Sequence, residues 1–232
     1  MTTVSPGSAA RLRAGVDRRL RARRSRYLNR ATGARTNGAR AAGVALTFDD
    51  GPMPGSTDRL LDVLDRLDVP ATFFCVGRNA ERHLALLRRI AEAGHAVGSH
   101  SLTHPHPRDL TPGQVRVEYE TGRLAVEQAL GAPVVLFRPP HGHLSVATIP
   151  LLRELRPWLW SRDPEDWRPG VRREHVEQVV GQSADGDVVL LHDWVEQPAG
   201  PASLDRSATI DAVPGVVAAV RSRGLAFTRL PA

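Results

Sequence analysis

The chain contains 232 residues, of which 41% are hydrophobic and 24% are charged, a composition typical of one globular domain and unlike collagen, a coiled coil or a disordered chain. The single cysteine, Cys75, excludes an intrachain disulfide and a cysteine-rich zinc module. The net charge of +6 is unevenly distributed: residues 1–40 carry eleven arginines and one acid (+10), and the other 192 residues carry 20 arginines and 24 acids (−4). An acidic body argues against a nucleic-acid-binding fold, so no specific nucleic acid is expected as a partner.

Residues 1–42 are predicted to form an Arg-rich extension that is poorly ordered. Leu12, Val16 and Leu20 have helical spacing, which leaves open a basic amphipathic helix that contacts a membrane surface or RNA. A solvated extension is the favoured interpretation. No apolar run reaches the ~18 residues that cross a bilayer, and no secretory signal follows the arginines. We therefore expect a cytoplasmic protein.

From residue 43 onward, short apolar runs alternate with amphipathic stretches, which predicts repeated βα units and a parallel sheet. The predicted strands are Val44–Phe48, Thr72–Val76, Ala96–Ser99, Val134–Phe137, Trp158–Ser161, Val188–Leu191 and Ala226–Leu230. The predicted helices are Thr57–Leu67, Asn79–Ala93, Thr111–Leu130, Ser145–Leu155, Arg172–Gln182 and Ser207–Arg223. About seven units over residues 43–232 suit a small α/β barrel; an open doubly wound sheet is the alternative.

Charged and polar residues follow almost every predicted strand. Because the carboxyl ends of parallel strands meet at one edge, these side chains are expected to converge. The segments are Asp49-Asp50, His100 to His104, Arg138 to His141, Asp163 to Trp167, and His192-Asp193. This rim is therefore the predicted functional site.

A metal site is indicated by the first two segments. Successive strand side chains diverge, so Asp49 and Asp50 cannot share one role, and one can bind a metal while the other faces a water. A helix cap or an Asx turn before Gly51-Pro52 is the alternative for this pair. His100 and His104, four residues apart, would point the same way on a helical turn. Two imidazoles and one carboxylate form a familiar ligand set for catalytic Zn²⁺, with His106 as a competing ligand.

The later segments suggest acid–base and binding groups. Arg138 keeps its charge and can orient a carboxylate, unless it forms a surface salt bridge. His192 titrates near neutrality and can act as a general acid, unless it is a buried histidine satisfied by the backbone. Three tryptophans, Trp160, Trp167 and Trp194, could stack on a sugar or belong to the core. For Trp160 the core is favoured.

Taken in order, the segments resemble the motifs of the polysaccharide deacetylase family, the NodB homology group or carbohydrate esterase family 4. They are Thr47-Phe48-Asp49-Asp50-Gly51-Pro52, His100-Ser-Leu-Thr-His104, Arg138-Pro-Pro-His-Gly142, Asp163-Pro-Glu-Asp166-Trp167 and Leu190-Leu-His192. The resemblance covers about four-fifths of the chain. It implies a distorted (β/α)7 barrel over residues 43–232 and a divalent metal, Zn²⁺ or another ion such as Co²⁺. It also implies hydrolysis of acetyl groups from N-acetylated carbohydrate.

The resemblance also implies roles for individual residues. The base would be Asp49 and the acid His192, with a metal that polarises the carbonyl and holds the attacking water. The remaining roles fall to Asp50, His100 and His104 as metal ligands, Arg138 orienting Asp49, Asp166 tuning His192, the His141 backbone at the oxyanion, and Leu190 with Trp167 around the acetyl methyl group.

One departure from the family pattern concerns substrate choice. His141 stands where the family commonly has tyrosine, which puts the usual polymer preference in doubt. The alternatives are therefore a deacetylase of a small acetamido sugar or of an O-acetyl ester, and an inactive carbohydrate-binding barrel.

Overall fold

The computed structural model describes residues 27–36 and 43–231. Its strands all pair in parallel, in the order β4-β3-β2-β1-β5, with β6 beside the start of β1. The strands are β1 (Val44–Asp49), β2 (Thr72–Cys75), β3 (Ala96–Ser99), β4 (Leu136–Phe137), β5 (Val188–His192) and β6 (Phe227–Thr228). The helices are α2 (Thr57–Leu67), α3 (Gly77–Arg82), α4 (Leu84–Glu92), α5 (Pro112–Leu130), α6 (Ile149–Leu155), α7 (Arg173–Gly181) and α8 (Ser207–Arg221). The predicted parallel α/β fold is confirmed.

The two edges of the sheet are joined by residues 158–162. Trp158 donates its backbone N–H to the carbonyl of Phe137 in β4 at 2.8 Å. On the other side, Ser161 donates to Val188 in β5 at 2.9 Å, and Leu190 donates to the carbonyl of Arg162 at 2.9 Å. The segment predicted as a strand over Trp158–Ser161 thus forms isolated bridges. It connects β4 to β5, as a distorted barrel requires.

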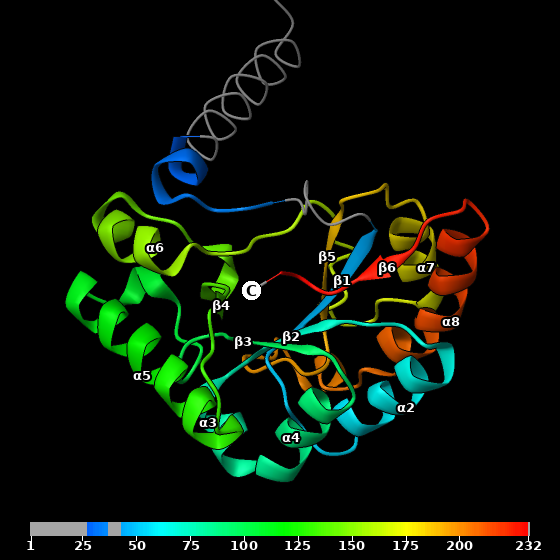
Figure 1. The fold of residues 1–232 in the computed structure, drawn as a ribbon, viewed down its shortest axis with the longest axis horizontal. Helices are drawn as coiled ribbons and strands as arrows, with labels where there is room; N and C mark the ends of the chain where they lie inside the picture. The colour runs from blue at the N-terminus through cyan, green and yellow to red at the C-terminus, as the bar shows by residue number, and fades with distance from the viewer. Residues whose placement is uncertain (1–26, 37–42, 232) are drawn as a thin grey trace, which may run out of the picture.

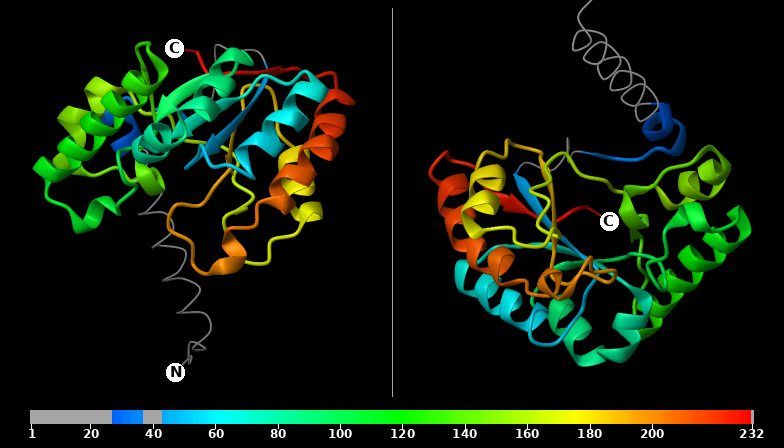
Figure 2. Two further views of the ribbon diagram at one scale, coloured as in Figure 1. Left: turned by 90° about the horizontal axis from the view of Figure 1, so that it is seen from below. Right: turned by 180° about the vertical axis from the view of Figure 1, so that it is seen from behind.

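Helices surround the strands on the outside (Figure 1). All six residues of β1 are buried, as expected for a strand covered on both faces. The loop after β5 and the carboxyl end of β1 lie at one end of the domain, and strand β6 lies at the other (Figure 2, left). Within the described part of the chain, no helix combines the length and apolarity needed to cross a membrane.

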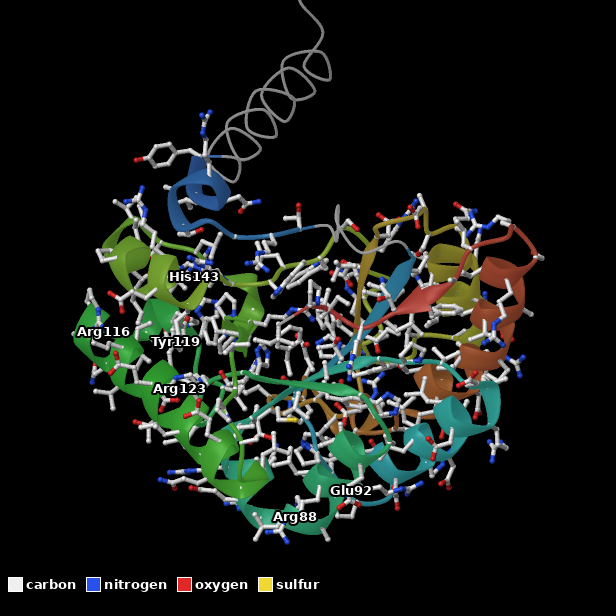
Figure 3. The ribbon with its side chains drawn as sticks, viewed as in Figure 1. Arg88, Glu92, Arg116, Tyr119, Arg123 and His143 are labelled. Carbon is white, nitrogen blue, oxygen red and sulfur yellow. The ribbon has the colours of Figure 1, made fainter. Side chains whose placement is uncertain are left out.

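Helix α5 shows how the sequence determines an element. Thr111 and Gln114 form a capping box at its start, and Gly131, with φ 73°, ends it. Tyr119 faces inward and packs on Phe137 with ring centroids 4.8 Å apart. Arg116 and Arg123 of the same helix (Figure 3) each pair with a glutamate four residues later.

Several predicted elements are shorter or divided: β6 spans only Phe227–Thr228, α6 starts at Ile149, and two further cases have a local cause. The helix predicted over Asn79–Ala93 is two helices, because His83 (φ −125°, ψ 50°) ends α3 and its carbonyl starts α4. Strand β4 starts two residues later than predicted, because Val134 donates its N–H to the Glu127 side chain at 3.0 Å. Local hydrogen bonds thus replace the regular pattern in both places.

Residues 27–36 differ from the predicted poorly ordered extension. Residues 27–32 are helical, and Leu28, 5% exposed, packs in an apolar cluster with Tyr119 and Leu152. Arg35 then pairs through its backbone with Pro157 and Leu159. Burial of the apolar Leu28 explains why this part is packed on the domain.

The remaining predictions for the extension are not addressed by these contacts. The amphipathic helix predicted around Leu12, Val16 and Leu20 lies outside the described residues. The domain boundary between residues 42 and 43 stays a prediction.

The packing of α5 can be tested at Gly122. A Cβ at this position would lie 2.1 Å from the carbonyl carbon of Ser101 and 2.4 Å from the nitrogen of Leu102. We expect Gly122→Ala to lower the free energy of unfolding by about 1–3 kcal/mol, measured by urea denaturation. Gly113→Ala in the same helix is the matched control: apart from its chain neighbours and the adjacent helix backbone, no described atom lies within 4 Å of a Cβ at this position, so stability should stay equal or rise. Equal stabilities of the two variants would contradict this packing.

Candidate functional site

The carboxyl ends of the strands bring the predicted residues together. Asp49 ends β1, His192 ends β5, and His100 and Arg138 directly follow β3 and β4. A pocket of about 260 Å³ opens at this edge. Its lining includes Asp49, Asp50, His104, His141, Leu190 and His192. The prediction that parallel strands deliver these groups to one rim therefore agrees with their positions.

Asp50 turns back into this pocket because the chain leaves the strand at that residue. Its φ of 78° lies in the left-handed region, which non-glycine residues seldom adopt. Its Oδ1 lies 3.5 Å from His100 Nε2 and 3.3 Å from His104 Nε2. This oxygen is buried and has no hydrogen-bond partner among the described residues. One ligand atom from each of the three residues lies within 4.8 Å of the others.

The two histidines are suited to bind a cation. His100 Nδ1 is 2.7 Å from the carbonyl of Arg138, so Nδ1 carries the proton and Nε2 keeps its lone pair. Burial lowers the pKa of His100 well below its usual value and lowers that of His104 to about 4. Both rings are therefore neutral. An unpartnered carboxylate oxygen beside two neutral imidazoles fits a divalent cation.

The loop between these histidines is not the helical turn that their spacing suggested. Ser101 and His104 have φ values of 67° and 55°. Leu102 donates its N–H to Glu118 in α5 at 3.0 Å, and its carbonyl accepts from Arg78 in α3 at 3.0 Å. Contacts with two helices thus hold the loop in this shape. His106, the competing ligand, stacks on His141 with centroids 4.6 Å apart.

Asp49 is held by the buried guanidinium of Arg138. Nη1 donates to Asp49 Oδ1 and to Thr47 Oγ1, both at 2.7 Å. Arg138 is fully buried and Asp49 is 3% exposed, so the alternative of a surface salt bridge does not apply. Burial raises the pKa of Asp49, and Arg138 opposes that rise by favouring the ionised carboxylate.

His192 is paired with Asp166 on the opposite wall. Nδ1 lies 2.7 Å from Asp166 Oδ1, and the backbone N–H of His192 donates to Oδ2 at 2.9 Å. Burial alone would favour the neutral ring, but the Asp166 carboxylate raises the pKa of His192 to about 9. His192 is thus protonated at neutral pH, with Nε2 free of Asp166.

Apolar and aromatic residues complete the pocket. Leu190, Trp160 and Trp167 line it, and Trp167 is 38% exposed. Trp160, favoured as core, also packs against a buried cluster. His141 has a φ of 56°, and burial together with its histidine neighbours lowers its pKa to about 4. This wall can contact an apolar or sugar surface.

The sequence placed Asp193 at the rim but assigned it no role; in the structure it holds the loop after β1 in position. Its carboxylate accepts from the N–H of Gly51 at 3.1 Å and from the Thr57 hydroxyl at 2.5 Å. The Ser56 hydroxyl donates to the carbonyl of Asp193. A Cβ at Gly51 would lie 1.9 Å from the Asp193 carboxylate. The one signal available was the position of Asp193 directly after His192.

Comparisons with known proteins agree with this arrangement. A family model described as polysaccharide deacetylase matches residues 36–156. The chain is 32% identical to a peptidoglycan-N-acetylglucosamine deacetylase of Bacillus cereus, over 79% of this chain and 84% of that protein. It is 36% identical to a chitooligosaccharide deacetylase of Rhizobium leguminosarum bv. trifolii, over 81% and 90%.

A solved structure shares the fold as well. The family 4 acetyl xylan esterase of Clostridium thermocellum, in complex with a cobalt ion, superposes with a TM-score of 0.70 at 30% identity. The match covers 81% of this chain and 87% of that one. Together with the family match and the two relatives, it shows that this chain belongs to the polysaccharide deacetylase family.

Proposed function

We propose that the protein is a metal-dependent hydrolase that removes acetyl groups from N-acetylglucosamine units of an oligo- or polysaccharide. The observation that carries this proposal is the convergence of three sets of side chains on one pocket. They are the cluster of Asp50, His100 and His104, the Asp49–Arg138 pair, and the His192–Asp166 pair. The names of the relatives, a peptidoglycan and a chitooligosaccharide deacetylase, support an N-acetylated sugar as substrate.

The metal would be held by Asp50, His100 and His104, and Zn²⁺ is the ion that this donor set suits best. When bound, such an ion polarises an acyl carbonyl and lowers the pKa of water. Co²⁺ is a second candidate, because the acetyl xylan esterase structure contains cobalt. The buried, unpartnered Oδ1 of Asp50 is the atom whose desolvation a cation would offset.

Asp49 would act as the base. Arg138 occupies Oδ1, which leaves Oδ2 to accept a proton from the attacking water. The fixed guanidinium holds the carboxylate in one orientation and favours its ionised form. The backbone N–H of His141 would donate to the oxyanion that develops on the substrate carbonyl oxygen.

His192 would act as the acid. An amide releases a poor leaving group, so the departing nitrogen must gain a proton as the C–N bond breaks. Asp166 holds Nδ1–H and keeps the ring protonated, which leaves Nε2–H to make this transfer. The products are acetate and the free amino sugar.

An O-acetyl esterase activity is the second candidate, because one structural relative is an acetyl xylan esterase. An alcohol leaves more readily than an amine, so an ester depends less on the His192 proton. We expect the pocket wall formed by His141, Trp160 and Trp167 to influence which acetylated substrate is bound.

A substrate screen tests the proposed function directly. We expect acetate release from N-acetylglucosamine oligomers and peptidoglycan fragments to exceed release from acetylated xylan and small acetamido sugars. Release should stop on treatment with a chelator and return with Zn²⁺ or Co²⁺. Release from acetylated xylan alone would favour the esterase, and the absence of any release and any metal would indicate a carbohydrate-binding barrel.

The roles of the adjacent aspartates can be separated. Asp49→Asn removes the base and leaves the ligands, so zinc content should stay at the wild-type level while turnover falls by about 100- to 10,000-fold. Asp50→Asn replaces the anionic ligand with an amide and should lower zinc affinity. Metal analysis and acetate release measure both effects. Zinc loss in Asp49→Asn with retention in Asp50→Asn would show that the roles are reversed.

The pH dependence tests the acid. His192 must be protonated, so kcat/KM should fall as the pH rises through its pKa of about 9. In Asp166→Asn the carboxylate that raises this pKa is absent and burial dominates, so the alkaline limb should move down by about one pH unit or more. Asp211→Asn, an exposed change in α8, is the control. An alkaline limb that does not move in Asp166→Asn would argue against His192 as the acid.

A further inference from the structure

Two of the three proposed metal ligands, Asp50 and His104, adopt a left-handed backbone conformation that their residue types seldom adopt. Asp50 and His104 have φ values of 78° and 55°, in the region where a Cβ is crowded. Neither residue lies in a helix or a strand interior at that point. Contacts from elsewhere must therefore hold both ligands in position.

Glu196, in the loop after β5, contacts Asp50 from one side. Its backbone N–H donates to Asp50 Oδ2 at 2.9 Å. That bond fixes the carboxylate so that the other oxygen, Oδ1, faces His100 and His104. The direction of Asp50 in the pocket thus depends on a residue 146 positions away.

Asn79 of α3 forms a hydrogen-bonded bridge between Glu196 and Asp50. Asn79 Nδ2 donates to the backbone carbonyl of Asp50 at 2.9 Å and to Glu196 Oε2 at 2.8 Å. Both neighbours are acceptors, which assigns Nδ2 to this position and uses both of its hydrogens. The Glu196 carboxylate therefore orients the amide that holds the Asp50 backbone.

Gln197, the next residue, holds the other ligand. Its Nε2 donates to the backbone carbonyl of His104 at 2.8 Å, while Ser101 Oγ accepts from the His104 N–H at 3.0 Å. Consecutive residues of one loop thus contact the two ligands with left-handed backbones. The same loop directly follows His192, the proposed acid, which ends β5 four residues before Glu196.

We propose that Asn79, Glu196 and Gln197 form a ligand bracket, a set of positioning residues that holds Asp50 and His104 in the geometry needed to bind the metal. This inference rests on the proposed metal site and adds the groups that determine its affinity. The bracket acts through Asp50 and His104, so its removal lowers metal affinity even though all three ligands remain. It also connects the metal site to the loop that follows His192.

The test measures zinc affinity directly. Zinc-loaded protein is equilibrated with a competing chelator, and the dissociation constant for Zn²⁺ is determined for each variant. Asn79→Ala, Glu196→Ala and Gln197→Met each remove one side-chain contact of the bracket and leave the ligands in place. We expect each to weaken zinc binding by about tenfold or more, as loss of groups that orient metal ligands does.

Two further variants separate positioning from simple charge loss. Glu196→Gln keeps an acceptor for Asn79 and should stay within about twofold of wild type. Glu81→Ala removes an exposed carboxylate from the same helix as Asn79 and should also leave zinc affinity unchanged. If Glu196→Gln and Glu81→Ala weaken binding as much as Glu196→Ala, long-range charge and not the bracket controls affinity.

The outcomes distinguish the bracket from the proposed function. Circular dichroism and the metal-free Tm establish that each variant folds; if Asn79→Ala does not, the two loop variants decide. Zinc affinity that stays at the wild-type value in folded Glu196→Ala and Gln197→Met would overturn the bracket alone. A wild-type protein that takes up neither Zn²⁺ nor Co²⁺ would overturn the proposed function, and the bracket with it.

Discussion

The buried contact between Arg138 and Asp49 is the interaction on which the rest of the site depends. The guanidinium lies inside the barrel, 4.2 Å above the ring of Phe74, and donates to Asp49 and Thr47 on one side. On the other side, Nε and Nη2 donate to the carbonyls of Trp158 and Leu159 at 3.2 and 3.1 Å. Removing one partner of such a pair costs about 3–5 kcal/mol, because the remaining charge stays buried.

The Arg138 side chain contacts both the segment that connects β4 to β5 and the proposed base Asp49. Trp158 and Leu159 belong to the segment that connects β4 to β5. The Arg138 guanidinium, which orients the proposed base, therefore also holds this connecting segment in place. The carbonyl of Arg138 in turn accepts from His100 Nδ1, which links the base to a proposed metal ligand. A displacement of Arg138 would therefore disturb the fold, the base and the ligand set together.

On the opposite wall of the pocket, the proposed acid His192 is likewise held by a buried charged partner, Asp166. Asp166 is fully buried and accepts from His192 and from the hydroxyl of Thr209 at 2.8 Å. Arg206 donates to its backbone carbonyl. The proposed base and the proposed acid thus both have buried partners that orient them before a substrate binds, as expected of a preorganised site.

The sequence by itself determined the features that depend on neighbouring residues or on strand order. Hydrophobic runs located β1, β3 and β5, the Thr111–Gln114 box located the start of α5, and the order of the strand ends indicated that Asp49, His100, Arg138 and His192 would share one edge. These features follow from local geometry and from the parallel arrangement of βα units.

Only the tertiary structure decided the features that depend on contacts between distant segments. The contacts that Glu196, Gln197 and Asp193 make with Asp50, His104 and Gly51 each join residues more than 90 positions apart. No periodicity or spacing encodes such pairs, because each residue type is ordinary in a loop. The packing of Leu28 and the bridges of residues 158–162 were decided in the same way, by surfaces that exist only after the chain has folded.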